Sequence, residues 1–233
     1  MQTIEKYFIF SVMRNKVVLI TGSTGGIGKA LAEKFAAEGS KVIISGRQHD
    51  LLHANAESMK RKGGNVFVVP ADVSKESDCE RLVSETVNKF GGIDVLINNA
   101  GISMRALFED VDIEVIRKVM DVNFWGAVYT TKFAMPFLLK AKGSIVGISS
   151  IAGKKGLPGR CGYSASKFAL EGFLETLRTE NLKKDLHVLV ACPGFTASGI
   201  REKSLSKDGT AQGESPRDEK SMMTAEEVAG KIY

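Results

Sequence analysis

Short apolar runs alternate with longer amphipathic stretches along this chain from residue 16 onward. The apolar runs are rich in Val, Ile and Leu, which is typical of strands that are buried on both faces of a sheet. We expect strands at residues 17–20, 42–44, 66–69, 95–97, 144–148 and 188–190. Because strands and helical stretches alternate, the pattern predicts right-handed crossovers and a parallel sheet covered by helices on both faces.

The stretches between the runs repeat apolar residues at helical spacing. In the first of them, Ile27, Leu31 and Phe35 fall on one face, and Gly39 follows as a stop signal. We expect helices at residues 26–38, 49–62, 76–90, 112–140, 162–184 and 225–233. Pro136 lies inside the longest stretch and should bend or restart that helix. The predicted fold class is α/β, a doubly wound Rossmann sheet in a single domain.

One long segment interrupts this alternation. Residues 197–223 are rich in Ser, Gly, Lys, Asp and Glu and show no apolar periodicity. Loops of this length in compact domains are usually functional or disordered. We therefore expect a mobile substrate lid here, inside one domain that spans residues 16–233.

The two ends of the sequence carry weaker signals. Residues 1–15 precede the first strand as an extension, and their apolar run, residues 7–13, is too short to span a bilayer. The extension is expected to be packed or disordered, or to precede a natural start at Met13. A helix that begins at residues 225–233, where the sequence stops, suggests a chain cut short.

Composition narrows the range of partners. The chain is 43% hydrophobic and 25% charged, as is usual for a soluble globular protein, and its net charge of +5 is spread among acids. This distribution favours a solvated surface that helps an anionic cofactor approach, and no nucleic-acid or membrane partner. Cys79, Cys161 and Cys192 are widely spaced, which indicates reduced thiols in a cytoplasmic protein and no metal site.

A glycine-rich segment lies between the first strand and its helix, where a dinucleotide-binding loop belongs. Small residues there let the backbone turn sharply and approach a pyrophosphate, and the free amides of the helix N-terminus receive its charge. An ordinary glycine-rich turn is the alternative. The expected phosphate contacts are Gly22, Ser23, Thr24, Gly25, Gly26, Ile27 and Gly28.

The end of the second strand bears on which dinucleotide binds. NAD-binding proteins tend to have an acid there, about 20 residues past the glycines, to hold the ribose hydroxyls. This strand instead ends in Ser45, Gly46 and Arg47. Arg47 is suited to pair with a 2′-phosphate, and the Ser45 hydroxyl could assist. The sequence predicts NADP as the cofactor, with NAD as the alternative.

Tyr163 and Lys167 are four residues apart, so they project from one face of a helix. Neither side chain is a good acid–base catalyst alone, because their ordinary pKa values are about 10 and 10.4. Side by side, the ammonium favours the phenolate and lowers the pKa of the phenol. Such a pair could exchange a proton with an alcohol or carbonyl oxygen, although the same spacing occurs on many solvated helices.

Together, these motifs resemble the short-chain dehydrogenase/reductase family in its basic, single-domain form. The resemblance runs from Lys16 to Gly194 and covers several motifs in order: the glycine loop, Ala71-Asp72-Val73, Asn98-Asn99-Ala100-Gly101, Asn123, Ser150, the Tyr163 and Lys167 pair, and Pro193-Gly194. The resemblance implies the doubly wound fold already expected from the alternation of strands and helices.

The resemblance also implies a catalytic set. Ser150, thirteen residues before Tyr163, would bind the substrate oxygen, with Ser149 as the competing choice. Tyr163 would be the general acid in reduction and the base in oxidation. Lys167 would lower the pKa of Tyr163 and bind the nicotinamide ribose. Asn123 would hold a water molecule in the proton relay to Lys167.

Further cofactor contacts follow from the same resemblance. Asp72 would contact the adenine ring, although capping the next helix is a simpler role for it. The segment after the fourth strand would line the adenosine side, and the turn after the sixth would guide the chain past the nicotinamide. The residues implied are Asp72, Val73, Asn99, Ala100, Gly101, Pro193, Gly194 and Thr196, together with Tyr163 and Lys167.

The function implied is an NADP-preferring oxidoreductase that interconverts a secondary alcohol and a carbonyl in a small-molecule substrate. Relatives of this type often form homodimers or homotetramers, which we expect here. A nucleotide-sensing regulator without catalysis is one alternative, and the intact Ser150, Tyr163 and Lys167 argue against it. An epimerase or dehydratase is another, disfavoured by the glycine spacing and the short chain.

Overall fold

The structure, a computed structural model, describes residues 13–214, 218 and 221–233. Most of the expected N-terminal extension, residues 1–12, therefore lies outside the described residues, as do 215–217 and 219–220 of the expected lid.

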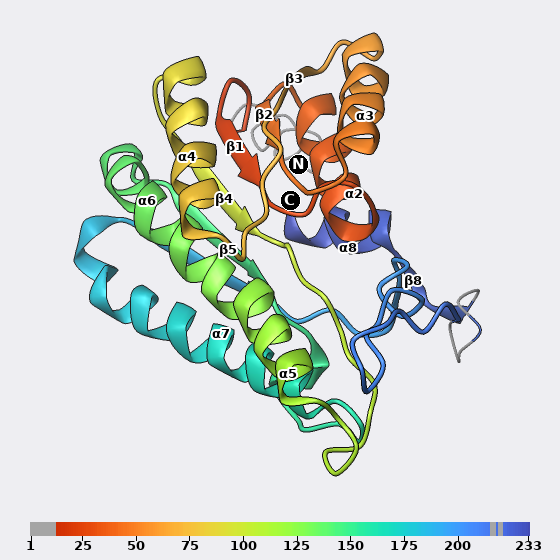
Figure 1. Cartoon of the computed structure of the whole chain (residues 1–233). Coiled ribbons are helices and arrows are strands. Elements are labelled where there is room, and N and C mark those ends of the chain that lie inside the picture. Colours follow the sequence, from red (N-terminus) through yellow and green to blue (C-terminus); the bar gives the residue numbers. More distant parts are fainter. Residues whose placement is uncertain (1–12, 215–217, 219–220) are drawn as a thin grey trace.

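Six parallel strands form one sheet in the spatial order β3-β2-β1-β4-β5-β6 (Figure 1). The order reverses between β1 and β4, which is the point where open α/β sheets bind ligands. The predicted strands are confirmed to within one residue at each end. They are β1 (Val17–Ile20), β2 (Lys41–Ile44), β3 (Asn65–Val68), β4 (Val95–Asn98), β5 (Ser144–Ile148) and β6 (His187–Ala191).

Helices cover both faces of this sheet, so the doubly wound, Rossmann-like fold is confirmed (Figure 1). One face carries α2 (Gly26–Ala37), α3 (His49–Arg61) and α8 (Ala225–Ile232), and the other carries α4 (Glu76–Phe90), α6 (Gly126–Ala141) and α7 (Cys161–Glu180). The shorter α5 (Ile113–Met120) packs against α7.

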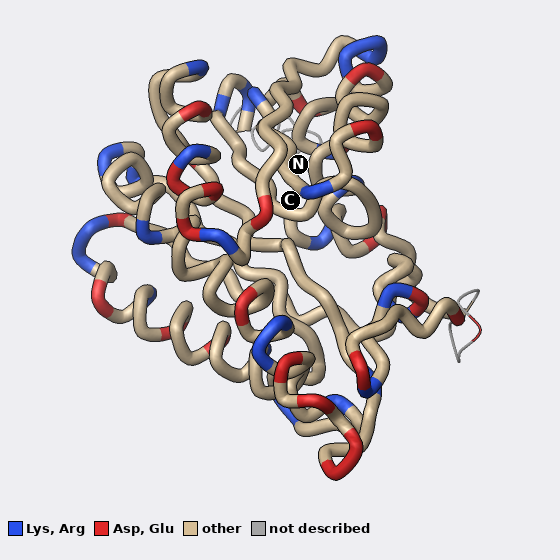
Figure 2. The backbone as a smooth tube through the Cα atoms, in the orientation of Figure 1, with Lys and Arg blue, Asp and Glu red and all other residues tan. Residues whose placement is uncertain are grey.

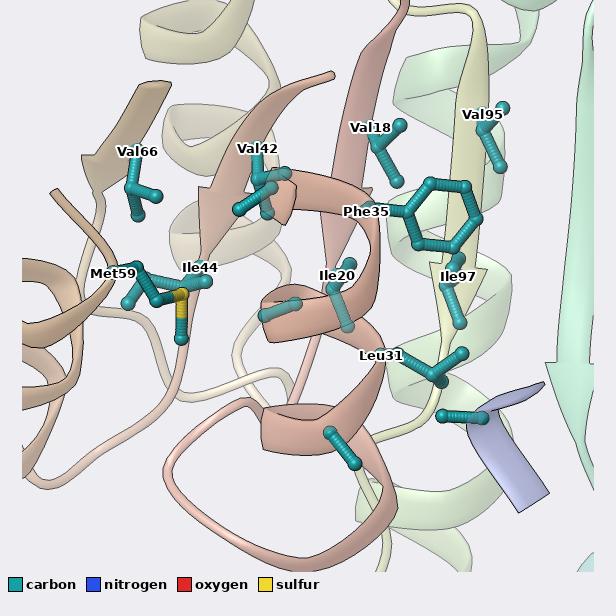
Figure 3. Close-up of a cluster of buried hydrophobic side chains, with 14 of the residues drawn as sticks. Val18, Ile20, Leu31, Phe35, Val42, Ile44, Met59, Val66, Val95 and Ile97 are labelled. Carbon is teal, nitrogen blue, oxygen red and sulfur yellow. The ribbon is translucent and has the colours of Figure 1, made fainter. Parts of the chain in front are cut away.

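Alternate residues of each central strand serve the two faces. In β1, Val18 and Ile20 join the cluster under α2, while Val17 and Leu19 join the cluster on the opposite face. Figure 3 shows the first cluster, in which Phe35 of α2 lies among strand side chains. Burying each of these large side chains stabilises the fold by about 1.5–3 kcal/mol. These two clusters hold the strand ends, and therefore the loops that follow them, in fixed positions.

The expected long helix over residues 112–140 is interrupted, but not by Pro136. A π-helical turn at Asp121–Trp125 separates α5 from α6, and α6 continues through Pro136. The extra backbone residue in the turn coincides with Asn123, whose side chain is tied to the backbone of Ile102. A restart of the helix at Pro136 is therefore wrong, because the interruption lies at the π-helical turn, where Asn123 is tied to Ile102.

The expected lid is attached to the domain at several points. Its ends form a small parallel pair, β7 (Thr196–Ala197) with β8 (Met223–Thr224). In its middle, Leu205 makes bridges with both Met104 and Ala211. Thr224 and Glu227 then form a capping box that starts α8, which packs on α2.

Figure 2 shows basic and acidic residues interspersed over the outer helices, as the interleaved sequence predicts. In the described part of the chain, no helix combines the length and the apolar character that a membrane span needs.

Candidate active site

A cavity of about 1090 Å³ runs along the carboxyl ends of the strands. Its walls come from the loops after all six strands, from the start of α7 and from residues 195–205. The cavity brings together most of the residues singled out from the sequence. Those that line it are Gly22, Thr24, Gly25, Gly26, Ile27, Gly28, Gly46, Arg47, Asp72, Val73, Asn99, Ala100, Gly101, Ser150, Tyr163, Lys167, Pro193, Gly194 and Thr196.

The glycine loop has a backbone that requires glycine at specific positions. Gly22 and Gly26 have φ values of +68° and +53°, which side chains with a Cβ rarely adopt. A Cβ on Gly28 would lie 2.3 Å from the Asn99 amide nitrogen and 2.4 Å from the Gly22 carbonyl oxygen. Gly25 has open space around it. The loop is therefore shaped by Gly22, Gly26 and Gly28.

Asn99 and Thr21 hold this loop against β4. The Asn99 amide donates to the carbonyl oxygens of Thr21 at 2.9 Å and Gly22 at 3.0 Å. The Thr21 hydroxyl in turn accepts from the backbone amides of Asn99 and Ala100. Asn99 thus positions the phosphate loop by its side chain, a function that its motif alone did not specify.

Ser23 and Ser45 lie beneath the loop and not on the cavity wall. Both side chains are fully buried, and the Ser23 hydroxyl donates to the Ile20 carbonyl oxygen at 2.7 Å. The Ser23 backbone amide donates to the Ser45 carbonyl oxygen at 2.8 Å. In the structure, these serines brace the loop against the end of β2.

The residues at this end fit a dinucleotide. The first-turn amides of α2 have no acceptor within the helix. Gly25, at the N-cap, supplies no side-chain acceptor either, so these amides are available to a pyrophosphate at the cavity wall. Arg47 is exposed at the edge of the cavity. Asp72 also lines it, and its carboxylate accepts from the backbone amide and hydroxyl of Ser74.

The catalytic candidates gather at the other end. Ser150 follows β5 and Tyr163 lies in the first turn of α7; both line the cavity, and Ser150 acts to lower the pKa of the Tyr163 phenol. Ser149, the competing serine, donates instead to the buried Glu171 carboxylate at 2.6 Å. The ammonium of Lys167 is buried and donates to the Ile148 carbonyl oxygen at 2.8 Å. The geometry therefore favours Ser150 over Ser149 as the partner of Tyr163.

The pKa values of this group are shifted in opposite directions. Burial raises the pKa of Tyr163, whereas Ser150 and the charges of Arg160 and Arg201 act to lower it. Burial also lowers the pKa of Lys167 to about 8. The Lys167 ammonium lies 5.8 Å from the centre of the Tyr163 ring. In this structure the opposing positive charge at Tyr163 comes from two arginines, where the sequence had suggested Lys167.

Asn123 lies behind the cavity wall in the π-helical turn. Its amide oxygen accepts from the Ile102 backbone amide at 2.8 Å, and its amide nitrogen donates to the Ile102 carbonyl oxygen and the Ser166 hydroxyl, each at 2.9 Å. A Cβ on Gly101 would lie 3.3 Å from Asn123 Oδ1 and 3.5 Å from Lys167 Nζ. Asn123 and Lys167 thus flank the same stretch of backbone.

Sequence reasoning missed a polar group under the catalytic residues. The Glu171 carboxylate, one turn after Lys167 on α7, accepts from Ser149, from Lys154 at 2.5 Å and from Cys192 at 3.4 Å. Its helical spacing from Lys167 was visible in the sequence. Its partners, which lie far away in the sequence, were not.

Sequence reasoning also missed several basic residues in the cavity wall. Arg105, Arg160, Arg201 and Lys203 all line the cavity, and the charges of Arg160 and Arg201 act on Tyr163. They come from three separate segments of the chain, at residues 105, 160 and 201–203, so no local motif marks them.

Comparisons with known proteins agree with this geometry. The family described as "short chain dehydrogenase" matches residues 16–209. A protein from Arabidopsis thaliana named "11-beta-hydroxysteroid dehydrogenase-like 2" is 43% identical over 197 residues, which cover 84% of this chain and 64% of that protein. The chain thus spans less than two thirds of the length of this curated relative.

Solved structures share the fold. An alcohol dehydrogenase from the archaeon Thermococcus sibiricus, complexed with 5-hydroxy-NADP, has a TM-score of 0.83 and 26% identity over 93% of this chain and 88% of its own. A short chain dehydrogenase/reductase from Burkholderia phymatum, in complex with NAD, has a TM-score of 0.83 and 25% identity over 94% of this chain and 84% of its own.

Proposed function

This chain belongs to the short-chain dehydrogenase family, and from that premise we propose that it is an NAD(P)-dependent oxidoreductase. The reaction interconverts a secondary alcohol and a ketone or aldehyde in a small-molecule substrate. The observation that carries the proposal is that Ser150, Tyr163 and Lys167 line the same cavity as the glycine loop. A regulator that only senses nucleotide would have no use for these side chains.

In the proposed reaction, each residue along the cavity has a different role. The bound cofactor supplies the hydride. The Ser150 hydroxyl holds the substrate oxygen, and Tyr163 donates its phenolic proton to that oxygen in reduction or accepts it in oxidation. Lys167, whose pKa is lowered to about 8, replaces the proton on Tyr163 and binds the nicotinamide ribose. Asn123 holds the backbone beside Lys167 and orders the proton relay that leads to Lys167.

The loops that follow the strands would hold the cofactor along the cavity. The amides at the start of α2 receive the pyrophosphate, and Asp72 and Val73 border the adenine. Pro193, Gly194 and Thr196 border the nicotinamide. We propose that residues 197–223 act as the substrate lid, that the protein is a cytoplasmic homo-oligomer, and that steroid-like alcohols belong in its first substrate screen because of the relative's name.

We propose NADP as the preferred cofactor because Arg47 lies exposed at the edge of the cavity beside the end of β2. An arginine there can pair bidentately with a 2′-phosphate. Replacing Arg47 by alanine should weaken NADPH binding about tenfold while NADH affinity stays within about twofold, in line with the loss of one charge-assisted contact. A fluorescence titration with both cofactors measures this, and unchanged NADPH affinity would exclude Arg47 as the selecting residue.

The decisive experiment for the reaction uses Tyr163→Phe. This change removes one oxygen, so NADPH affinity should stay near the wild-type value while the rate of carbonyl-dependent NADPH oxidation falls by roughly 10²–10⁴. Tyr129→Phe is the control, because Tyr129 stacks on Trp125 outside the cavity wall. A Tyr163→Phe enzyme with normal turnover would remove Tyr163 from the reaction.

A further inference from the structure

The charges on the cavity wall are strongly unbalanced. Within the described residues, the carboxylate that lines the cavity is Asp72, at the adenine end. Basic side chains line it along its whole length: Arg47, Arg105, Lys118, Arg160, Lys167, Arg201 and Lys203. A cavity lined by one sign of charge attracts ligands of the opposite sign. The cofactor is itself an anion, so some of these cations would bind its phosphates.

Several of the cations lie away from the phosphate loop. The backbone around Met104 meets the lid at Leu205, where the two residues form a bridge and the Arg105 amide donates to the Leu205 carbonyl oxygen at 2.8 Å. Arg105 adjoins one side of this junction and Lys203 adjoins the other. Both are exposed and line the cavity, and in the described part of the chain neither forms an ion pair with a carboxylate.

Arg160 joins the same junction from α7. Its guanidinium donates to the Ser103 hydroxyl, the Met104 carbonyl oxygen at 2.9 Å and the Ser204 hydroxyl at 3.4 Å. These contacts fix the guanidinium between the two crossing segments, three residues before Tyr163. Its positive charge reaches the Tyr163 phenol, where it acts to lower the pKa. Arg160 therefore adds a fixed positive charge to the part of the cavity that Tyr163 lines.

The cofactor accounts for the cations at the other end. Its pyrophosphate belongs at the start of α2, and a 2′-phosphate belongs at Arg47, as proposed above. The reacting nicotinamide carries no phosphate and separates those groups from Ser150 and Tyr163. The basic residues around the Met104–Leu205 junction thus border the space left for the substrate. The same space is bordered by the apolar side chains of Leu157, Phe195 and Ile200.

We propose that the substrate carries an anionic group, a carboxylate or a phosphate, which Arg105, Arg160 and Lys203 bind while its carbonyl or hydroxyl oxygen lies against Ser150 and Tyr163. This inference rests on the proposed oxidoreductase function and names the class of molecule that the site accepts. Arg160 provides a fixed positive charge, and Arg105 and Lys203 provide exposed cations on the two sides of the Met104–Leu205 junction.

The test compares ketones that differ in charge. Levulinate is paired with methyl levulinate, and acetol phosphate with acetol, so that the two pairs distinguish a carboxylate from a phosphate. Binding to the enzyme saturated with NADP is measured by calorimetry, and kcat/KM with NADPH is measured in parallel. In at least one pair, the anionic member should bind about tenfold more tightly and react with about tenfold higher kcat/KM. The preference should weaken as salt is added.

Charge reversal locates the site. Lys203→Glu and Arg105→Glu should each lower affinity for the preferred anion about tenfold and leave its neutral partner within about twofold. Lys207→Glu is the matched control, because Lys207 is exposed in the same segment but does not line the cavity. It should leave both affinities unchanged.

The outcomes separate this inference from the proposed function. Neutral ketones that bind and react as well as the anions would overturn the anion site while supporting the oxidoreductase. Anions that bind tightly and depend on Lys203, without any hydride transfer, would support the site while removing the activity. An equal loss in Lys207→Glu would overturn the site, because only the net charge would then matter.

Discussion

The proposed phosphate-binding end of the cavity, at the glycine loop, and the proposed catalytic end, at Ser150 and Tyr163, are built in different ways. At the phosphate end, the working atoms belong to the backbone, and the essential residues are glycines whose conformation or lack of a Cβ shapes the loop. At the catalytic end, the working atoms belong to side chains, and several of these are buried and charged. Tyr163, Lys167 and Glu171 lie on one helix, and each contacts residues from a distant segment.

This difference bears on how each end is stabilised. A site built from backbone atoms needs close packing. It is destabilised by steric overlap, since one added methyl group displaces the chain. A site built from charged side chains needs these charges to be buried away from water. Burial costs desolvation free energy, which hydrogen bonds offset only in part. The phosphate end should therefore be sensitive to size, and the catalytic end to charge and pH.

Among the substitutions that test stability, Gly28→Ala should cause the largest loss in the free energy of unfolding, because the glycine loop has no room for an added methyl group. The new Cβ would meet the Asn99 amide and the Gly22 carbonyl oxygen at 2.3 and 2.4 Å, so α2 must move away from both. We expect the free energy of unfolding to fall by about 3 kcal/mol. Thermal unfolding without cofactor measures this as a drop in Tm of roughly 6–12 °C.

Gly25→Ala is the matched control for that prediction. Gly25 precedes α2 in an extended conformation, with nothing within 4 Å of the position of a Cβ. Its unfolding free energy should stay within about 0.5 kcal/mol of the wild type. Equal losses in the two variants would show that any methyl group in the loop is harmful, and the steric account of Gly28 would then fail.

The same contrast governs what could be predicted from the sequence. The strands, the glycine loop and the start of α2 were predicted correctly, because short apolar runs and glycines act through local geometry. The Ser150 and Tyr163 pair was found through the spacing of a known motif. Its surroundings were not found, since Glu171, Ser149 and Cys192 come together only after β5, α7 and the loop after β6 have packed.

Three further features depended on contacts that no local pattern encodes. The π-helical turn at Asn123 is tied to Ile102, so the long helix is interrupted there and does not restart at Pro136. The bridges of Leu205 give order to a segment expected to be irregular throughout. Arg160 and Arg201 belong to charges that the sequence favours as solvated, yet both line the cavity and their charges act on Tyr163.

Lys167→Met tests whether buried charge is costly at the catalytic end. The substitution removes a buried ammonium and should stabilise the protein. Burial lowers the pKa of Lys167 from 10.5 to about 8, so the folded state carries a cost whenever this side chain is charged. Removing the charge gains more than the lost hydrogen bond to Ile148, and we expect a net gain of about 2 kcal/mol at pH 7 in unfolding experiments without cofactor.

The gain should depend on pH in a defined direction. Below about pH 8 both the folded and unfolded wild-type chains hold the Lys167 proton, so the difference between variant and wild type is constant there. From pH 8 to 10.5 the unfolded chain binds more protons, the wild type gains stability and the difference shrinks. Lys132→Met, at an exposed position on α6, should stay within about 0.5 kcal/mol throughout. A Lys167→Met protein less stable than wild type would contradict this account.

Glu171→Gln should change the free energy of unfolding least of the three substitutions. It should lower stability, in contrast to Lys167→Met, because the Glu171 carboxylate is hydrogen-bonded. Burial acts to raise the pKa of Glu171, but hydrogen bonds from Lys154, Ser149 and Cys192 outweigh it and hold the pKa below 4.5. The ionised form therefore stabilises the fold, and the variant should lose about 1 kcal/mol at pH 7, the usual contribution of such a bond.

Because the pKa of Glu171 is depressed in the folded state, its contribution is complete above pH 4.5 and is lost as pH falls through the folded value. Wild type and Glu171→Gln should thus converge in acid, while an exposed control on the same helix, Glu180→Gln, differs little from wild type at any pH. Urea unfolding between pH 3 and 7 measures this. A constant difference across that range would mean that Glu171 acts through its shape. The catalytic end would then depend on packing in the same way as the phosphate end, and the contrast between them would not hold.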